Sequence, residues 1–190
     1  MKIFTTLFCF FVFFQIGFAQ NKYEKETKVK KTEVPESAIQ FVERLGYSQK
    51  VNWYKEEGLK QVSFEAKTKY QGKWVSIEFS EQGVFEDLEV RIETSEVPKA
   101  TMQQIQEYLI EEHAKVKIVK VQIQFSGEEE LIIKDYDRME DLEGLTINYE
   151  LIISTKWKGS FTRFEYLFDR SGGFISRAKI VLKMTDNLEF

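Results

Sequence analysis

Glu33-Val34-Pro35 and Glu96-Val97-Pro98 are two copies of one tripeptide, and they contain the only two prolines of the 190-residue chain. Each copy precedes a stretch with helical spacing of apolar residues, then segments in which polar and apolar residues alternate. The first copy leads to Thr68-Lys69-Tyr70-Gln71-Gly72 and the second to Thr155-Lys156-Trp157-Lys158-Gly159. Self-similarity of this kind indicates a duplicated supersecondary unit. It predicts the architecture far better than the activity.

The prolines of the two copies predict the starts of two helices. Proline is favoured at the first helical position, where its missing N–H has no intrahelical partner. Gly46 is a natural stop for the first helix, and the second is expected to run to about Glu112. The apolar residues at helical spacing are Ala38, Ile39, Val42 and Leu45 in the first helix and Met102, Ile105 and Leu109 in the second.

Alternation of polar and apolar residues through most of the remaining chain predicts strands. Short connections favour antiparallel pairing, and one helix in each unit can cover only one face of a sheet. The predicted fold class is therefore α+β, with two tandem helix-plus-antiparallel-strand repeats forming one sheet of about seven or eight strands and the helices on one face. The expected strands cover 50–54, 62–70, 75–79, 88–92, 119–125, 147–157, 161–168 and 174–182.

The spacing of the repeated motifs gives the boundaries of the two units. The tripeptides are 63 residues apart (96 − 33) and the Thr-Lys-aromatic motifs are 87 apart (155 − 68), so the second unit has 24 additional residues (87 − 63). We expect a first unit over 33–95 and a second over 96–190, with an acidic insertion near 126–144. Residues 20–32 are rich in lysine and glutamate, and we expect a flexible leader there.

Residues 1–19 have the pattern of a secretory signal peptide. Lys2 supplies a positive charge, Leu7 to Ile16 is apolar, and Gly17-Phe18-Ala19 places small residues before an expected cleavage site. A membrane anchor is the alternative, but the apolar run is shorter than the roughly 20 residues that span a bilayer. We expect a periplasmic or secreted protein without a membrane span after signal removal. Cleavage also removes Cys9, the only cysteine, and with it any disulfide or thiolate metal site.

Composition and motifs exclude several classes of function. The net charge of −4, with both signs interspersed, is poorly suited to phosphate backbones, so we expect no nucleic-acid partner. His113 is the only histidine and is best explained as a surface residue near a helix C-terminus. The acidic run 135–141 fails the EF-hand pattern, because Met139 and Glu140 occupy positions 5 and 6, although an irregular calcium site stays open there. We expect no catalytic residue, no metal site, no cofactor and no enzymatic activity.

Some motifs of the chain are similar to a known family. Val-Pro opening a short helix, Lys50-Val51-Asn52-Trp53 after it, the Gly72-Lys73 hairpin and Phe-x-x-x-Gly resemble the PepSY-like domain of exported bacterial proteins, which is related in fold to the β-lactamase-inhibitor protein. The likeness covers about residues 33–183 as two tandem units. It departs from the family where Tyr47-Ser48 and His113-Ala114 replace a common Tyr-Pro. The resemblance implies a secreted or periplasmic, non-enzymatic protein whose sheet binds a protein or peptide.

Two aromatic residues fall on the polar phase of their predicted strands. Trp74 and Phe85 share this mixed face with charged residues such as Glu78 and Arg91. If the helices cover the apolar face, the mixed face looks outward, and exposed aromatic residues among charges are typical of a protein-recognition surface. Ordinary cross-strand packing is the alternative explanation. The candidate binding residues are Trp74, Phe85, Glu78, Arg91 and Trp53.

Together these observations favour an exported, non-catalytic protein that binds a protein or peptide of the cell envelope on the open face of its sheet. Inhibition of an envelope enzyme is one form that such binding could take. A structural or stress-related envelope protein without a discrete ligand is a second hypothesis. A carrier of a small molecule or calcium is a third. No motif names the partner.

Overall fold

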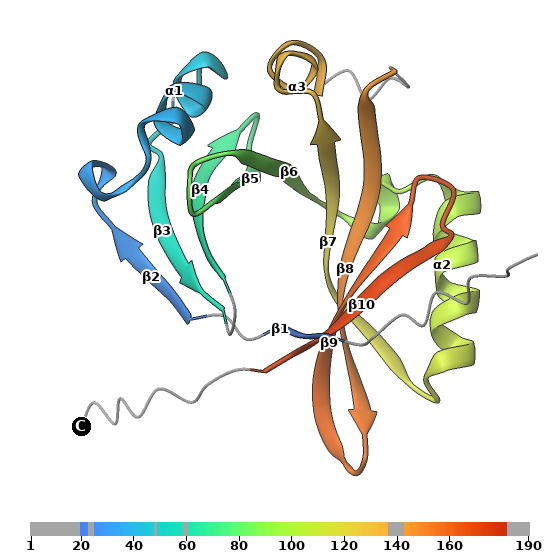
Figure 1. Cartoon of the computed structure of the whole chain (residues 1–190). Coiled ribbons are helices and arrows are strands. Elements are labelled where there is room, and N and C mark those ends of the chain that lie inside the picture. Colours follow the sequence, from blue (N-terminus) through green and yellow to red (C-terminus); the bar gives the residue numbers. More distant parts are fainter. Residues whose placement is uncertain (1–19, 23–24, 48, 59–60, 137–142, 182–190) are drawn as a thin grey trace, which may run out of the picture.

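The computed structural model describes residues 20–22, 25–47, 49–58, 61–136 and 143–181. The predicted signal peptide lies outside these residues, as does most of the acidic run 135–141. The described strands form one sheet in the order β1-β10-β9-β8-β7-β6-β5-β4-β3-β2 (Figure 1). Neighbouring strands from β2 to β10 are antiparallel, and β1 pairs parallel with β10. The strands are β1 (Gln20–Lys22), β2 (Lys25–Val29), β3 (Asn52–Glu57), β4 (Val62–Tyr70), β5 (Lys73–Ser80), β6 (Phe85–Ile92), β7 (Val116–Gly127), β8 (Leu145–Trp157), β9 (Ser160–Asp169) and β10 (Phe174–Ile180).

The helices of the described chain pack on one face of this sheet, which we call the apolar face. Phe41 of the first helix stacks on Phe85 of β6, with ring centroids 4.6 Å apart. Tyr108 of the second lies edge-on to Phe168 of β9 at 5.6 Å. The predicted α+β fold class is therefore confirmed. The helices are α1 (Glu36–Arg44), α2 (Lys99–Glu112) and α3 (Glu129–Asp135), and short 3-10 turns η1 (Lys31–Glu33) and η2 (Thr94–Glu96) precede the first two.

Both helix starts lie one residue later than predicted. Pro35 and Pro98 are N-cap residues with extended ψ angles of 138° and 135°, so the first helical residue follows each proline. Each proline carbonyl still accepts the first helical hydrogen bond, from the N–H of Ile39 at 3.2 Å and of Met102 at 2.9 Å. No helix among the described residues has both the length and the apolar composition needed to cross a bilayer.

The segment expected to be a flexible leader, residues 20–32, contains strands β1 and β2 and most of the 3-10 turn η1. Strand β2 pairs along its whole length with β3, from Lys25 opposite Glu57 to Val29 opposite Trp53. The prediction of a flexible leader was wrong because it was based on the charged composition of the segment. An edge strand is held by backbone hydrogen bonds to its neighbour, and charged residues are common on sheet edges. Lys28 also donates a hydrogen bond of 3.0 Å to the Asn52 side chain across this pair.

The same order of elements occurs twice along the chain. A 3-10 turn, a helix and four strands follow one another from η1 to β6 and again from η2 to β10, with α3 between β7 and β8 of the second series. Corresponding hairpins turn at Gln71-Gly72 and Lys158-Gly159, where all four residues have positive φ angles between 49° and 88°. Two consecutive positive φ angles are typical of the type I′ turn that joins twisted antiparallel strands.

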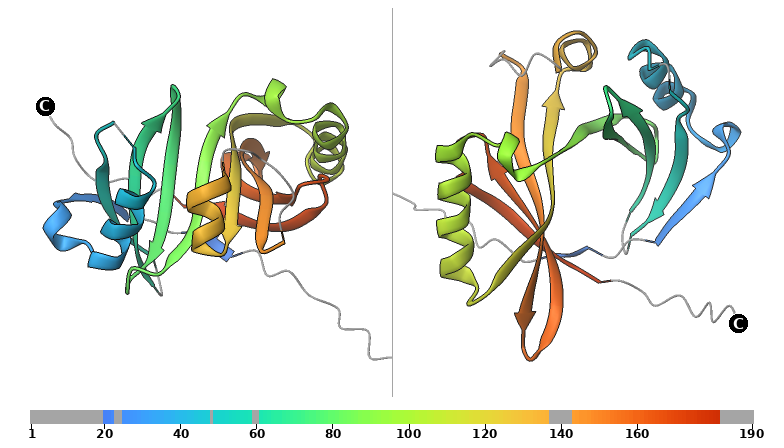
Figure 2. Two further views of the ribbon diagram at one scale, coloured as in Figure 1. Left: turned by 90° about the horizontal axis from the view of Figure 1, so that it is seen from above. Right: turned by 180° about the vertical axis from the view of Figure 1, so that it is seen from behind.

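The sheet is strongly curled, because its two edge strands are consecutive in the chain. Lys22 ends β1 and Lys25 begins β2, and three residues span at most about 11 Å. A flat sheet of this size would separate its edges by nine strand spacings, or roughly 43 Å. The strands accordingly form an arch with the helices around its periphery, as the views in Figures 1 and 2 show.

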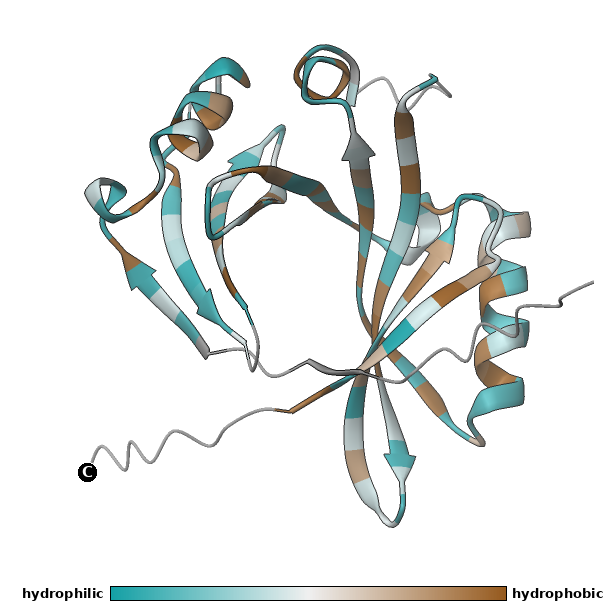
Figure 3. Cartoon of the chain, viewed as in Figure 1, coloured by the Kyte–Doolittle hydropathy of each residue, from teal (hydrophilic) through white to brown (hydrophobic). Residues whose placement is uncertain are grey.

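Hydrophilic and hydrophobic residues alternate along many of the strands (Figure 3). Successive side chains of a strand point to opposite faces of the sheet, and we call the face opposite the apolar one the polar face. The helices pack on the apolar face, yet several polar-face side chains near the middle of the sheet are buried, including Glu65, Glu89, Gln122 and Glu150. Curling of the sheet accounts for this burial, because the polar face lies on the inside of the arch. The polar face comprises Glu65, Lys67 and Lys69 of β4, Trp74, Ser76 and Glu78 of β5, Asp87, Glu89 and Arg91 of β6, Gln122 and Gln124 of β7, and Asn148 and Glu150 of β8.

Candidate binding site on the polar face

Three of the five candidate binding residues lie on the polar face. Val75 of β5 pairs with Val90 of β6, so the adjacent residues Trp74 and Arg91 lie beside one another on the polar face. Glu78 lies further along β5 on the same face, two positions after Ser76. The Trp74 side chain is 50% exposed, and Nζ of Lys69 lies 4.6 Å from the centre of its ring. The exposed end of the polar face therefore presents an aromatic ring between cations.

Phe85 does not lie on the polar face as predicted. Glu78 pairs with Asp87, whereas the next residue of β5, Phe79, pairs with Phe85, so β6 contains one extra residue at this point. This β-bulge reverses the alternation of side chains. Phe85 consequently points into the core against Phe41 and is 8% exposed.

Trp53 also belongs to the core. Its side chain is 5% exposed, and its ring centroid lies 6.0 Å from that of Phe79. One edge of the residue lines a groove of about 260 Å³ between α1 and strands β2 and β3, together with Ile39, Val42 and Val51. Trp53 and Trp74 therefore lie on opposite faces of the sheet and do not form one site.

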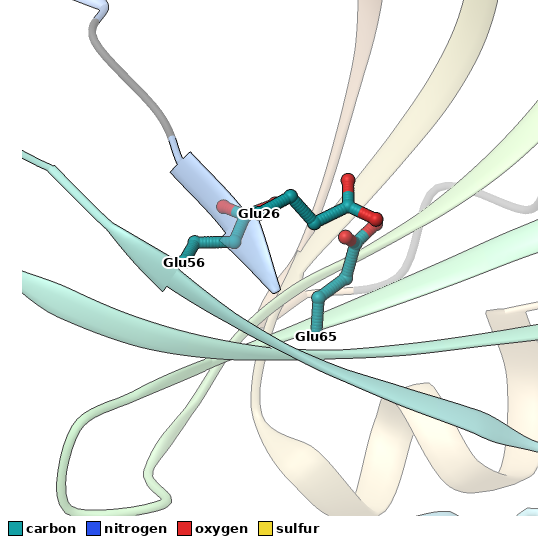
Figure 4. A group of neighbouring side chains, drawn as sticks. All are labelled: Glu26, Glu56 and Glu65. Atoms are coloured by element: carbon teal, nitrogen blue, oxygen red, sulfur yellow. The ribbon is translucent and has the colours of Figure 1, made fainter. Parts of the chain in front are cut away.

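A group of three glutamates lies near the edge of the polar face (Figure 4). Glu26 of β2 and Glu65 of β4 point their carboxylates toward one another, and Glu56 of β3 completes the group. Nζ of Lys67 lies 2.8 Å from a carboxylate oxygen of both Glu26 and Glu65. Burial alone would lower the pKa of Lys67, but the two carboxylates outweigh it and raise the pKa above its usual value. This group contains its own cation and has a structural role.

A second group of carboxylates lies nearer the middle of the sheet. Glu78, Asp87 and Glu89 each place one carboxylate oxygen within 4.8 Å of the others. Burial raises the pKa of Glu89 well above its usual value, and the neighbouring carboxylates of Glu150, Glu78 and Asp87 raise it further. Of this group, only Glu78 was among the predicted binding residues. Hairpin register could have found Asp87, because it is directly opposite Glu78.

Amide side chains surround this second group. Nε2 of Gln122 donates a hydrogen bond of 2.5 Å to Oε2 of Glu89, and Nε2 of Gln124 donates one of 3.2 Å to Oδ2 of Asp87. Asn148 in turn donates to Oε1 of Gln124 at 3.4 Å. The single oxygen of the first amide, Oε1 of Gln122, is buried and has no hydrogen-bond partner among the described residues. This part of the polar face is rich in oxygen atoms and in negative charge.

His113 was predicted to be a surface residue, but its side chain is buried at the C-terminal end of α2. Its side chain is 5% exposed, and Nε2 lies 2.8 Å from the hydroxyl of Tyr166. Arg177 donates a hydrogen bond of 3.3 Å to the same hydroxyl and lies 2.7 Å from Glu112. Burial, and then the charge of Arg177, lower the pKa of His113, while Glu112 acts in the opposite direction. A neutral imidazole enclosed by aromatic rings suits the core better than acid–base catalysis.

Comparison with known proteins identifies solved structures that have a similar fold. No protein-family model matches the chain, and no curated protein matches its sequence. Two solved structures resemble it with TM-scores of 0.50: a putative periplasmic protein of Bacteroides eggerthii, 12% identical, and a DUF2874 family protein of Bacteroides ovatus, 9% identical. Both similarities cover 77% of this chain, and 88% and 87% of the respective neighbours. A BLIP-like protein of Bacteroides fragilis is 14% identical over 82% of this chain and 92% of its own, with a TM-score of 0.47. At this identity the two similarities with a TM-score of 0.50 show a shared fold alone.

Proposed function

We propose that the chain is an exported, non-catalytic protein that binds a protein or peptide on the exposed end of its polar face. The half-exposed indole of Trp74 carries this proposal, because it lies between Lys69 and Arg91 on a face that the helices leave uncovered. Tryptophan and arginine are enriched at the centres of protein interfaces. The cations beside the ring favour an acidic segment of the partner.

Further observations on export and on the titratable groups support this function. The pattern of residues 1–19 predicts export, and the Bacteroides eggerthii neighbour is named as a putative periplasmic protein. Glu89 and His113, whose pKa values are shifted mainly by burial, are poor candidates for catalysis, because both side chains are buried. The resemblance to the PepSY-like domain also implies binding without catalysis.

Site-specific photo-crosslinking tests the proposed surface. A photoreactive amino acid is placed at Trp74, and in a control protein at Ile110, which is 69% exposed on α2 away from the polar face. In native envelope extract, we expect a discrete adduct from position 74 that weakens when Arg91 is replaced by alanine or when salt is raised. The same adducts from both positions, or none from position 74, would reject this surface.

A further inference from the structure

The second group of carboxylates has the geometry of a cation site. Glu78 and Asp87 lie directly opposite one another on β5 and β6, and Glu89 follows on the same face of β6. One oxygen from each lies within 4.8 Å of the others. Calcium binds oxygen ligands at about 2.3–2.6 Å, so two ligands on opposite sides of the ion are roughly 4.6–5.2 Å apart. The three side chains can therefore contact one ion without a change in the backbone.

The amide of Gln122 provides an independent observation. The residue is 4% exposed, and its Nε2 is fixed on Glu89, which holds the amide against the carboxylates. Its Oε1 has no hydrogen-bond partner among the described residues. Buried polar atoms are almost always paired with protein, water or an ion. An amide oxygen is a normal calcium ligand. An ionised carboxylate cannot form a hydrogen bond with this oxygen, because both groups are acceptors.

We propose that Glu78, Asp87, Glu89 and Gln122 form a divalent-cation site, with calcium as the ion that best suits this all-oxygen donor set. Gln124 positions the site by holding Oδ2 of Asp87. In the group of glutamates at the edge of the polar face, Lys67 provides a positive charge within 2.8 Å of Glu26 and Glu65. They offer a matched control. The competing explanation is a proton shared between Glu89 and Glu150, which are hydrogen bonded. Such a proton would relieve the repulsion among the carboxylates without a cation.

Calcium titration of the purified chain tests the proposal without reference to any protein partner. Isothermal calorimetry with calcium chloride should show one saturable site, and calcium should raise the melting temperature. Asp87→Asn should weaken binding at least tenfold, whereas Glu26→Gln in the control group should leave it unchanged. Gln122→Leu, which removes only a neutral ligand, should weaken binding several-fold and serves if Asp87→Asn does not fold.

Two results would overturn the cation site. One is the absence of heat and of any change in melting temperature at millimolar calcium, as expected if the carboxyl groups share a proton. The other is calcium binding that persists at full affinity in both Asp87→Asn and Gln122→Leu, which would place the ion elsewhere, for example on the acidic run 135–141. Neither result would bear on Trp74 crosslinking, so the two proposals can fail separately.

Discussion

Gly83 and Gly172 allow two turns of the sheet to lie against the starts of helices α1 and α2. Gly83 has a φ of +78°, and a Cβ atom there would lie 2.4 Å from Oγ of Ser37 and 2.5 Å from Cβ of Pro35. Ser37 donates a hydrogen bond of 2.8 Å to the Gly83 carbonyl. In the second half of the chain, Thr101 of α2 donates one of 3.2 Å to the carbonyl of Arg170, two residues before Gly172. A helix start is thus held by a turn in each half.

Replacement of Gly83 should therefore destabilise the protein by more than backbone strain alone would. Gly83→Ala is expected to lower the free energy of unfolding by about 2–4 kcal/mol, because it adds a steric clash to the strain of a positive φ angle. Gly72→Ala, with φ of +81° but nothing within 4 Å of the new methyl group, should cost only about 1 kcal/mol. Urea unfolding of both variants measures the difference. Equal losses would show that the contact with α1 contributes nothing.

The bulge in β6 predicts effects of very different size for the replacement of two aromatic residues. Phe85→Ala should destabilise the protein by about 3–5 kcal/mol, since it empties a core position stacked on Phe41. Trp74→Ala should change stability by less than about 1 kcal/mol, because its ring is half exposed. Denaturant titrations of the two variants check this. A large loss for Trp74→Ala would mean that its ring is a structural element rather than a free recognition surface.

Elements were predicted better than the residues within them. Helical spacing and alternation located α1, α2 and the strands from β3 to β9, because these elements bury apolar residues against the core. Strand β10 was also predicted, although none of its residues is buried. Strands β1 and β2 were missed because their pairing with β10 and β3 uses the backbone. Phe85 was misplaced because alternation cannot reveal an extra residue in a strand. His113 was misplaced because its burial depends on Tyr166, 53 positions away.

The end of helix α2 should make stability depend on pH. Burial and Arg177 lower the pKa of His113 in the folded chain, so the unfolded chain binds the proton more readily. The stabilisation is complete above the unfolded pKa of about 6.5 and is lost as pH falls below it towards the folded pKa. The contribution of His113 to the melting temperature should therefore decrease between pH 7 and pH 5.

The variant His113→Gln isolates this contribution. It should be less stable than the wild type at pH 7, and the difference should shrink as pH falls. Glu89 acts in the opposite direction, since its raised pKa favours the folded state at lower pH, but it is present in both proteins. A constant difference across this range would show that His113 is not buried in its neutral form.

The two halves of the chain are joined by contacts near the ends of α1 and α3, as well as by the pairing of β6 with β7. The hydroxyl of Tyr47, after α1, donates a hydrogen bond of 3.1 Å to that of Tyr136, after α3. The ring of Tyr136 also lies 6.2 Å from Tyr70 and 5.9 Å from Phe125. Arg44 and Glu130 form an exposed ion pair beside them at 2.6 Å. The insertion between β7 and β8 therefore connects the second half of the chain to the first.

These contacts should differ greatly in strength. Tyr136→Ala is expected to cost about 3–5 kcal/mol, because it removes an aromatic ring from the boundary of the two halves. Tyr136→Phe should cost about 1 kcal/mol for the lost hydrogen bond, and Arg44→Ala less than about 1 kcal/mol, because both partners of its ion pair are exposed. Chemical denaturation measures all three. Comparable losses for Arg44→Ala and Tyr136→Ala would contradict this ranking.

The parallel pairing of β1 with β10 has a consequence for the order in which the chain can assemble. Gln20 is opposite Ala178, a separation of 158 positions (178 − 20). Closing so long a loop is entropically unfavourable until the intervening hairpins have formed and brought the ends together. The earliest strand to emerge during synthesis must therefore wait for the latest one. A nascent chain that stops before Phe174 leaves its first strand without a docking edge, and exposes it to any other chain with an unpaired edge.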